Sequence, residues 1–258
     1  MFKKLILPTY SLWARELIRF VRQRSRMIGV IGSPILFWFF IGSGLGSSFR
    51  SSSTMRGNES YLEYFFPGTL LLIMLFTAIF STISIIEDRK EGFLQSVLVA
   101  PISGASIALG KILGGMTLAV LQALIFLALA PLIGFRFTVM QLPVLILVLA
   151  FIGFGLTGLG FLIAWRMEST QGFHAIMNLF LIPLWLLSGA LFPSEGGPGW
   201  LQWLMAVNPL TYCLSATRQL LYHQVTAGRT EFVISIVIIL SFCLVVFVGS
   251  MYSVRRKV

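Results

Sequence analysis

The residues that could bind a nucleotide in this sequence do not form a complete phosphate-binding loop. Such a loop needs the pattern G-x-x-x-x-G-K-[ST], whose backbone amides wrap the phosphates and whose hydroxyl binds magnesium. The nearest approach runs from Gly104 to Gly110 and Lys111, with one residue too many between the glycines. Ile112 stands where the hydroxyl is needed. The sequence therefore predicts no ATP site on this chain.

Other catalytic and metal-binding signatures are also missing from the sequence. It contains no H-E-x-x-H, C-x-x-C or G-x-S-x-G motif. His174 and His223 are expected on opposite sides of a membrane, and two cysteines in different kinds of segment, Cys213 and Cys243, indicate neither a disulfide framework nor a metal site. We therefore expect no catalytic residue, no metal and no cofactor on this chain.

A charged cluster followed by a short apolar stripe is the most distinctive segment, at residues 87–103. Leu94, Val97, Leu98 and Pro101 recur at helical spacing, so the segment can present an apolar face to a partner. The candidate partner-coupling residues of this segment are Glu87, Arg89, Glu91, Gly92, Leu94, Val97, Leu98, Pro101, Ile102 and Ser103.

A few polar residues interrupt the apolar runs and could line a substrate pathway. They are Thr77, Ser81, Gln122 and Asn178. Polar groups in membrane spans also hold helices together, at roughly 1 kcal/mol each, and this is the more common role.

The composition requires that these residues sit in a membrane. Of the 258 residues, 57% are hydrophobic and 11% are charged, and the mean hydropathy is +0.91. Six runs approach the roughly 20 residues that cross a bilayer as a helix. They cover about 27–45, 67–86, 107–130, 142–164, 174–193 and 232–251. The sequence predicts an all-α integral membrane protein with one transmembrane domain of six helices over 1–258.

Most of the 19 Lys and Arg residues fall in the N-terminal segment, the C-terminal tail and the segments that share their side. By the positive-inside rule, both termini are expected in the cytoplasm. This placement of the +10 charge suits an anionic membrane face, and we expect contact with membrane lipids and none with nucleic acid.

Two segments have the pattern of helices that lie at the membrane surface. Residues 9–26 carry an apolar stripe of Trp13, Leu17, Phe20 and Val21 beside a row of arginines, which predicts an interfacial helix. Whether it is a passive anchor or has a mechanical role stays open. Residues 199–222 predict two short amphipathic helices that either dip into the outer leaflet or rest on its headgroups. Their marked residues are Trp200, Trp203, Asn208, Pro209, Tyr212 and Arg218.

Residues 87–111 resemble the permeases of type-2 ABC exporters, whose pattern is E-x-x-R-E-x-G-T-L-x-x-L-L-x-x-P-I-S followed by Gly-Lys. The matching residues are Glu87, Glu91, Gly92, Leu94, Pro101, Ile102, Ser103, Gly110 and Lys111. Phe93 replaces the usual Thr and Gln95 an often acidic residue. A second match spans Asn208 to Tyr212 and ends at Arg218, with Ser215 in place of the family's acidic residue.

The resemblance is closest to drug and antibiotic export permeases. It implies that 87–103 is a cytoplasmic coupling helix for an ABC ATPase subunit, and that 199–222 is a re-entrant outer gate. It also implies a second copy of the chain, ATP and magnesium on the ATPase, a prokaryotic plasma (inner) membrane, and export of a hydrophobic or amphiphilic drug, lipid-like molecule or glycan. The alternatives are a non-transporting scaffold or assembly factor working with an ABC ATPase and, third, an intramembrane enzyme.

Overall fold

The computed structural model describes residues 2–22, 29, 32, 35–44, 61–135, 138, 141–191, 198–222 and 229–255. Throughout these ranges the regular structure is helical, without strands. The elements are α1 (Phe2–Arg22), α3 (Tyr61–Ser81), α4 (Ile83–Lys90), α5 (Phe93–Val99), α6 (Gly104–Leu127), η1 (Ala130–Ile133), α7 (Gln141–Arg166), α8 (Thr170–Leu186), α9 (Gly199–Val207), α10 (Pro209–Leu221) and α11 (Arg229–Arg255). The predicted all-α class agrees with this structure.

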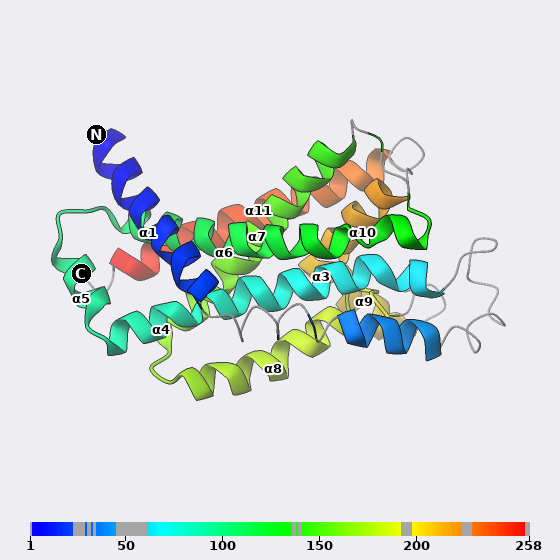
Figure 1. Ribbon diagram of the computed structural model, residues 1–258, viewed down its shortest axis with the longest axis horizontal. Coiled ribbons are helices and arrows are strands. Elements are labelled where there is room, and N and C mark those ends of the chain that lie inside the picture. The colour runs from blue at the N-terminus through cyan, green and yellow to red at the C-terminus, as the bar shows by residue number, and fades with distance from the viewer. Residues whose placement is uncertain are drawn as a thin grey trace.

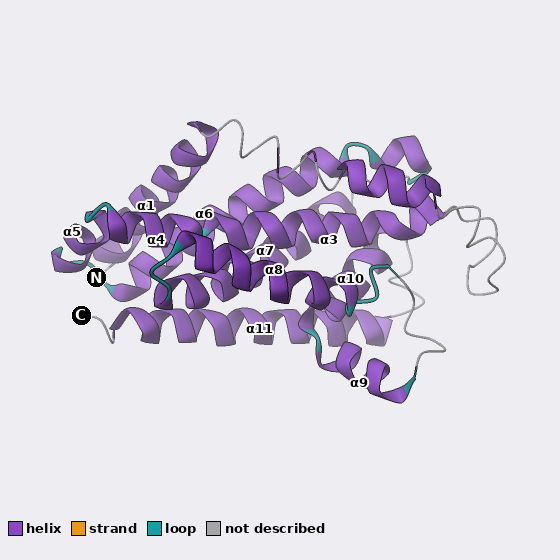
Figure 2. Ribbon diagram, turned by 90° about the horizontal axis from the view of Figure 1, so that it is seen from below, coloured by secondary structure: helices purple, strands orange, loops and turns teal. Residues whose placement is uncertain are grey.

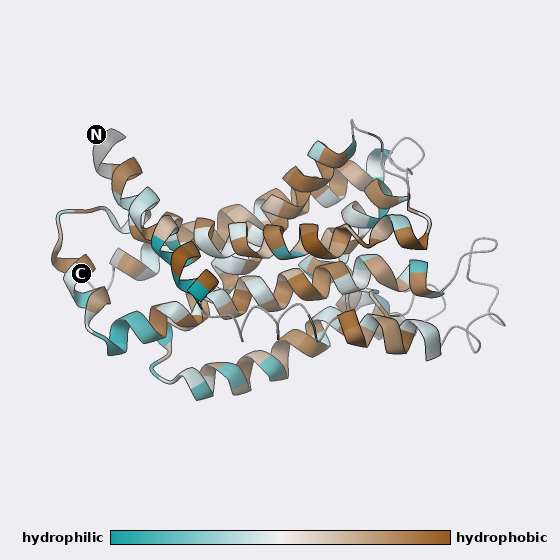
Figure 3. Ribbon diagram, in the orientation of Figure 1, coloured by the Kyte–Doolittle hydropathy of each residue, from teal (hydrophilic) through white to brown (hydrophobic). Residues whose placement is uncertain are grey.

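Four helices are long and apolar enough to cross a membrane, by length and composition. They are Tyr61–Lys90, Gly104–Leu127, Gln141–Arg166 and Arg229–Val254. Each corresponds to one of the expected runs, although Tyr61–Lys90 starts before residue 67 and combines α3 and α4. Hydrophobic residues, coloured brown, predominate along these helices (Figure 3).

The other two expected spans are shorter in the structure. α8 has 17 residues, so it reaches about 26 Å at 1.5 Å per residue, somewhat less than a bilayer core. In the first run, 27–45, an apolar helix covers Ile35–Gly44, and most of the rest lies outside the described residues.

α3 forms the centre of the bundle. In Tyr61–Lys90, 89% of the most apolar window is buried inside the protein, against 22% in Arg229–Val254. α6 and α7 pack on α3, and α11 packs on α7 (Figure 1). The low burial of α11 leaves a long apolar face for lipid or for another subunit.

The two ends of the bundle differ. The start of α1, the end of α11 and the α4–α5 corner lie at one end, and α9 and α10 lie toward the other (Figure 1). α9 projects from the side of the bundle (Figure 2). The expected surface helix at 9–26 is found as α1, which begins earlier, at Phe2; residues 23–26 lie outside the described part.

Candidate functional site

A tight corner between α4 and α5 follows the charged residues of segment 87–103. The backbone N–H of Glu91 donates to the Glu87 carbonyl at 2.9 Å, and that of Gly92 donates to the Arg89 carbonyl at 3.2 Å. Gly92 has φ of +77°, a left-handed conformation that glycine adopts without strain and that commonly ends a helix. The corner therefore depends on Gly92 and turns the chain into α5.

The apolar stripe of α5 faces the bundle rather than solvent. Leu94 is buried, and Val97, Leu98 and Ile102 pack against the core. Val97 and Leu98 are nevertheless half-exposed and Pro101 is exposed, so presentation of this part of the stripe to a partner stays a prediction. The outward face carries Gln95, Ser96, Val99 and Pro101.

Ser103 closes the segment as the N-cap of α6. Its hydroxyl accepts a hydrogen bond from the Ser106 N–H at 3.1 Å, which satisfies one of the free amides of the first turn. Pro101 and Ile102 separate this cap from α5. Ser103 thus has a structural task, and the exposed edge from Gln95 to Pro101 is the part free to meet another protein.

Arg89 points inward and fastens α4 to α7. Its guanidinium donates to the carbonyls of Trp165 at 2.6 Å and Met167 at 2.7 Å, and lies 5.8 Å from the centre of the Trp165 ring. These carbonyls belong to the C-terminal end of α7, where a cation is favoured by the helix dipole. The structure therefore gives Arg89 an intramolecular partner.

Asp88, next to Arg89, points to the opposite side and binds α1. Its carboxylate accepts from Arg15 at 2.6 and 2.8 Å and from Arg19 at 2.8 Å. Lys111 of α6 donates to the same carboxylate. The pKa of Arg15 is raised above its ordinary value, mainly because its guanidinium is hydrogen-bonded to Asp88. Burial of Arg15 acts in the opposite direction and lowers its pKa.

The remaining charges of the cluster continue outward from Asp88. Lys111 also donates to Glu16 at 2.5 Å, and Arg19 donates to Glu87 at 2.7 Å and approaches Glu91 at 3.6 Å. The Arg15 guanidinium lies 3.7 Å from the centre of the Phe93 ring, in cation–π geometry. We call Arg15, Glu16, Arg19, Glu87, Asp88 and Lys111 the charge cluster.

α1 lies close against α6 because glycine faces it. A Cβ atom on Gly110 would lie 2.7 Å from Cβ of Leu12 and 3.0 Å from the Thr9 carbonyl oxygen. Farther along, the Trp13 indole donates to the Thr117 hydroxyl at 3.0 Å. Of the apolar stripe expected on an interfacial helix, Trp13 contacts α6 and Phe20 is buried in the protein. Val21 stays exposed.

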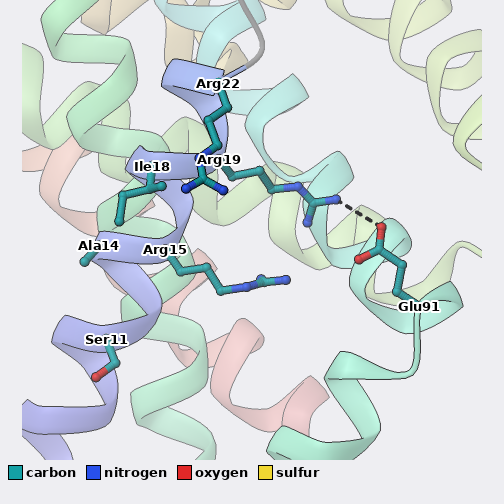
Figure 4. A pocket seen from close by; sticks show the side chains of 7 residues that line it. All are labelled: Ser11, Ala14, Arg15, Ile18, Arg19, Arg22 and Glu91. Carbon is teal, nitrogen blue, oxygen red and sulfur yellow. Dashed lines mark ion pairs between the residues drawn. The ribbon is translucent and has the colours of Figure 1, made fainter.

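An open pocket of about 540 Å³ separates α1 from the corner. It is lined by Ser11, Ala14, Arg15, Ile18, Arg19, Arg22 and Glu91. Arg15 and Arg19 extend across it toward the segment that bears Glu91 (Figure 4). Both arginines already bind carboxylates of the charge cluster, so the pocket is the open side of that cluster.

At the other end of the bundle, α9 and α10 are tied to the end of α8. The Asn208 amide donates to the Leu184 carbonyl at 2.7 Å, and its side-chain oxygen caps α10, which Pro209 begins. Arg218 donates to the Gly189 carbonyl at 3.0 Å and lies 4.4 Å from the Tyr64 ring centre. Asn208 therefore ties the start of α10 to the end of α8, and Arg218 ties the last turns of α10 to the turn that follows α8.

The other marked residues of this segment are less enclosed. The Tyr212 hydroxyl donates to the Ala206 carbonyl at 2.8 Å, joining α10 to α9. Trp200 and Trp203 are 66% and 64% exposed on α9, so they face lipid, headgroups or a partner rather than this chain.

The candidate pathway residues do not share one location. Thr77 donates to Gln122 between α3 and α6, and the Ser81 hydroxyl donates to the Ala78 carbonyl at 2.7 Å. All three are buried among helices, where they serve packing, while Asn178 is exposed on α8. Among the described residues no group of three His, Cys, Asp or Glu side chains could hold a metal ion.

Comparison with known proteins identifies the family. Residues 8–222 match the family described as ABC-2 type transporter. This chain belongs to the ABC-2 type transporter family. Four of its helices are long and apolar enough to cross a membrane, and its family is one of transporters. The chain is therefore an integral membrane protein.

Individual relatives are permeases by name. The chain is 27% identical over 216 residues to the putative transport permease ycf38 of Cyanophora paradoxa, covering 83% of this chain and 74% of that one. It is 26% identical over 223 residues to the daunorubicin resistance ABC transporter permease protein DrrB1 of Streptomyces coeruleorubidus, covering 84% and 75%. The match to the probable multidrug ABC transporter permease YbhR of Escherichia coli K12 is 28% identical and covers 63% of this chain and 45% of YbhR.

The sequence reasoning missed the charge cluster of this ABC-2 protein. The arginines of 9–26 are expected beside the apolar stripe of an interfacial helix, and Lys111 is identified only as the end of a family motif, so neither is assigned a partner within the chain. Arg15 and Arg19 lie four residues apart on a helix, and 87–91 holds three acids, so complementary charge was the available signal. The pairing itself joins residues about 70 positions apart, and no local pattern reports it.

Proposed function

We propose that this chain is the membrane-spanning permease subunit of an ATP-driven exporter, powered by a separate ABC ATPase subunit. The single observation that carries the proposal is the α4–α5 corner. It presents Glu91, Gln95, Ser96 and Val99 outward at one end of a membrane bundle, while Asp88 and Arg89 fasten the same corner to other helices. A push on α5 would therefore reach the bundle.

The family supports each part of this proposal. Its named members are transport permeases, and those called daunorubicin resistance, doxorubicin resistance and multidrug permeases favour a hydrophobic or amphiphilic cargo. In this proposal ATP and magnesium bind the ATPase subunit, and the chain itself binds no cofactor.

The proposed membrane arrangement has six spans, formed by the four long helices together with 27–45 and α8. In this proposal the fifth span is formed by α8 together with the turn that follows it. Both termini and α5 are then cytoplasmic in a prokaryotic inner membrane, with α9 and α10 as re-entrant helices at the outer end.

A second copy of the chain completes the proposed exporter. α8 exposes Ile176, Leu179, Phe180 and Ile182 around the polar Asn178. An exposed amide among apolar side chains is costly in lipid, and a facing subunit would bury it beside a shared pathway.

The test is reconstitution of the permease with its ATPase in proteoliposomes. Replacing Gly92 with Ala forces a side chain into the left-handed corner, and Glu91→Ala removes the exposed acid beside it. We expect both variants to lower substrate-stimulated ATP hydrolysis and transport together, by about tenfold if the lost coupling is in the common range. Gly153→Ala is a matched control, since the added atom would meet its nearest neighbours at 3.5 Å.

Transport by the wild-type permease without an ATPase would refute the proposed function. Normal transport by both variants would refute the coupling role of this corner.

A further inference from the structure

Asp88 is completely buried, yet it is charged and sits beside the outward-facing corner. Its side chain is 0% exposed, and three cations from two other helices contact it: Arg15 and Arg19 of α1 and Lys111 of α6. Burial of an unpaired carboxylate is strongly unfavourable, so the site exists only while these partners stay in place.

The cluster as a whole is balanced in charge, with three cations and three acids, and Arg15 and Arg19 are 30% and 21% exposed. Lys111 is 3% exposed and Glu16 is 6% exposed, and Lys111 bridges Glu16 and Asp88 while donating to the Ser84 hydroxyl at 3.2 Å. Arg15 supplies the second cation. Such a group adds little net stability over apolar side chains, but it fixes how the helices that bear it are placed.

The same helices are also in close packing contact. α1 contacts Gly110 at Leu12 and Thr9, and Arg15 covers the ring of Phe93, the first residue of α5. Asp88 therefore lies where α1, the α4–α5 corner and the first half of α6 meet.

We propose that Asp88 is a positioning residue that makes α1, the α4–α5 corner and the start of α6 move as one block during the transport cycle. This rests on the proposed function, and it gives α1 a mechanical role beyond that of a membrane anchor. Motion imposed on α5 passes through Asp88 and Lys111 into α6.

The first test removes the link while keeping the charge balanced. In the complete complex, Asp88→Asn leaves Lys111 and the arginines in excess, whereas the double variant Asp88→Asn/Lys111→Met deletes one buried charge of each sign. If the cluster were only structural, the double variant would recover both folding and transport. We expect it to recover thermal stability and ATPase binding, while transport per ATP hydrolysed stays about tenfold below wild type.

Glu231→Gln is the matched control, because it makes a similar acid-to-amide change at an exposed site in the first turn of α11. Normal transport per ATP in a well-assembled double variant would overturn the inference. The proposed function would still stand in that case if Glu91→Ala and Gly92→Ala remained uncoupled.

The second test does not depend on any variant of the cluster. Spin labels on Ser11 of α1 and Ser96 of α5, both exposed, report the distance within the block, and labels on Ser96 and Gln171 of α8 report the distance across it. Both pairs are placed in a background with Cys213 and Cys243 replaced by Ala. On adding a non-hydrolysable ATP analogue to the complex, we expect the first distance to stay constant and the second to change. A change in the Ser11–Ser96 distance as large as the change across the block would refute the shared motion.

Discussion

At the scale of single residues, two adjacent side chains attach the α4–α5 corner to different helices. Asp88 binds α1 and α6, and Arg89 binds the carbonyl end of α7. Neighbouring residues on a helix point about 100° apart, so one turn of α4 can hold separate helices on its two sides. The corner is thus connected to the bundle in two directions by residues of opposite charge.

Arg89 can be tested independently of Asp88. Arg89→Gln loses two charge-assisted hydrogen bonds to the end of α7, and we expect the free energy of unfolding to fall by about 2 kcal/mol. Arg89→Lys keeps the charge but cannot span two carbonyls with a planar fork, so an intermediate loss is expected. Thermal melting in detergent measures both variants, with the exposed neighbour Lys90→Gln as the control. Equal melting temperatures for Arg89→Gln and Lys90→Gln would contradict the clamp.

At the scale of elements, periodicity and apolar length predicted much of what the structure contains. The four long helices and the two short helices around Asn208 were predicted from the residue pattern, whereas the left-handed corner at Gly92 was not. What each apolar stripe packs against could not be predicted from the sequence. α1 and α5 both turn apolar stripe residues toward the protein, because a stripe does not reveal whether lipid or another helix covers it.

The close contact of α1 with α6 is an element-scale feature that depends on one missing side chain. Gly110→Ala should displace α1, because the new Cβ would meet Leu12 and the Thr9 carbonyl at 2.7 and 3.0 Å. Gly153→Ala, which lies in α7 with ordinary 3.5 Å spacing, serves as the matched control. We expect trypsin to cut after Arg15 and Arg19 faster in Gly110→Ala than in wild type or the control, as detected by mass spectrometry. Identical cleavage rates would show that α1 does not rely on this approach.

At the scale of the whole molecule, the two ends of the bundle differ, and this asymmetry agrees with the proposal that an ATPase acts on one end only. One end gathers α1, the α4–α5 corner and the charge cluster, while the other is held by hydrogen bonds from α10 to the end of α8. The bundle between them is mostly apolar, and Thr77 of α3 donates to Gln122 of α6 within it. The sequence predicted which segments occupy each end, whereas the contacts that connect them required the folded chain.

The proposed orientation follows from this asymmetry and can be measured in cells. The basic residues concentrate at the end that bears α5, and positive charge is retained on the cytoplasmic side. In a background with Cys213 and Cys243 replaced by Ala, Val99→Cys on α5 and Gly199→Cys at the start of α9 place thiols at two exposed sites. We expect a membrane-impermeant thiol reagent to label Gly199→Cys in intact cells and Val99→Cys only in inverted vesicles. Labelling of Val99→Cys from outside would place the corner beyond the reach of any cytoplasmic ATPase, because a charged segment such as 87–91 does not cross the bilayer during the cycle.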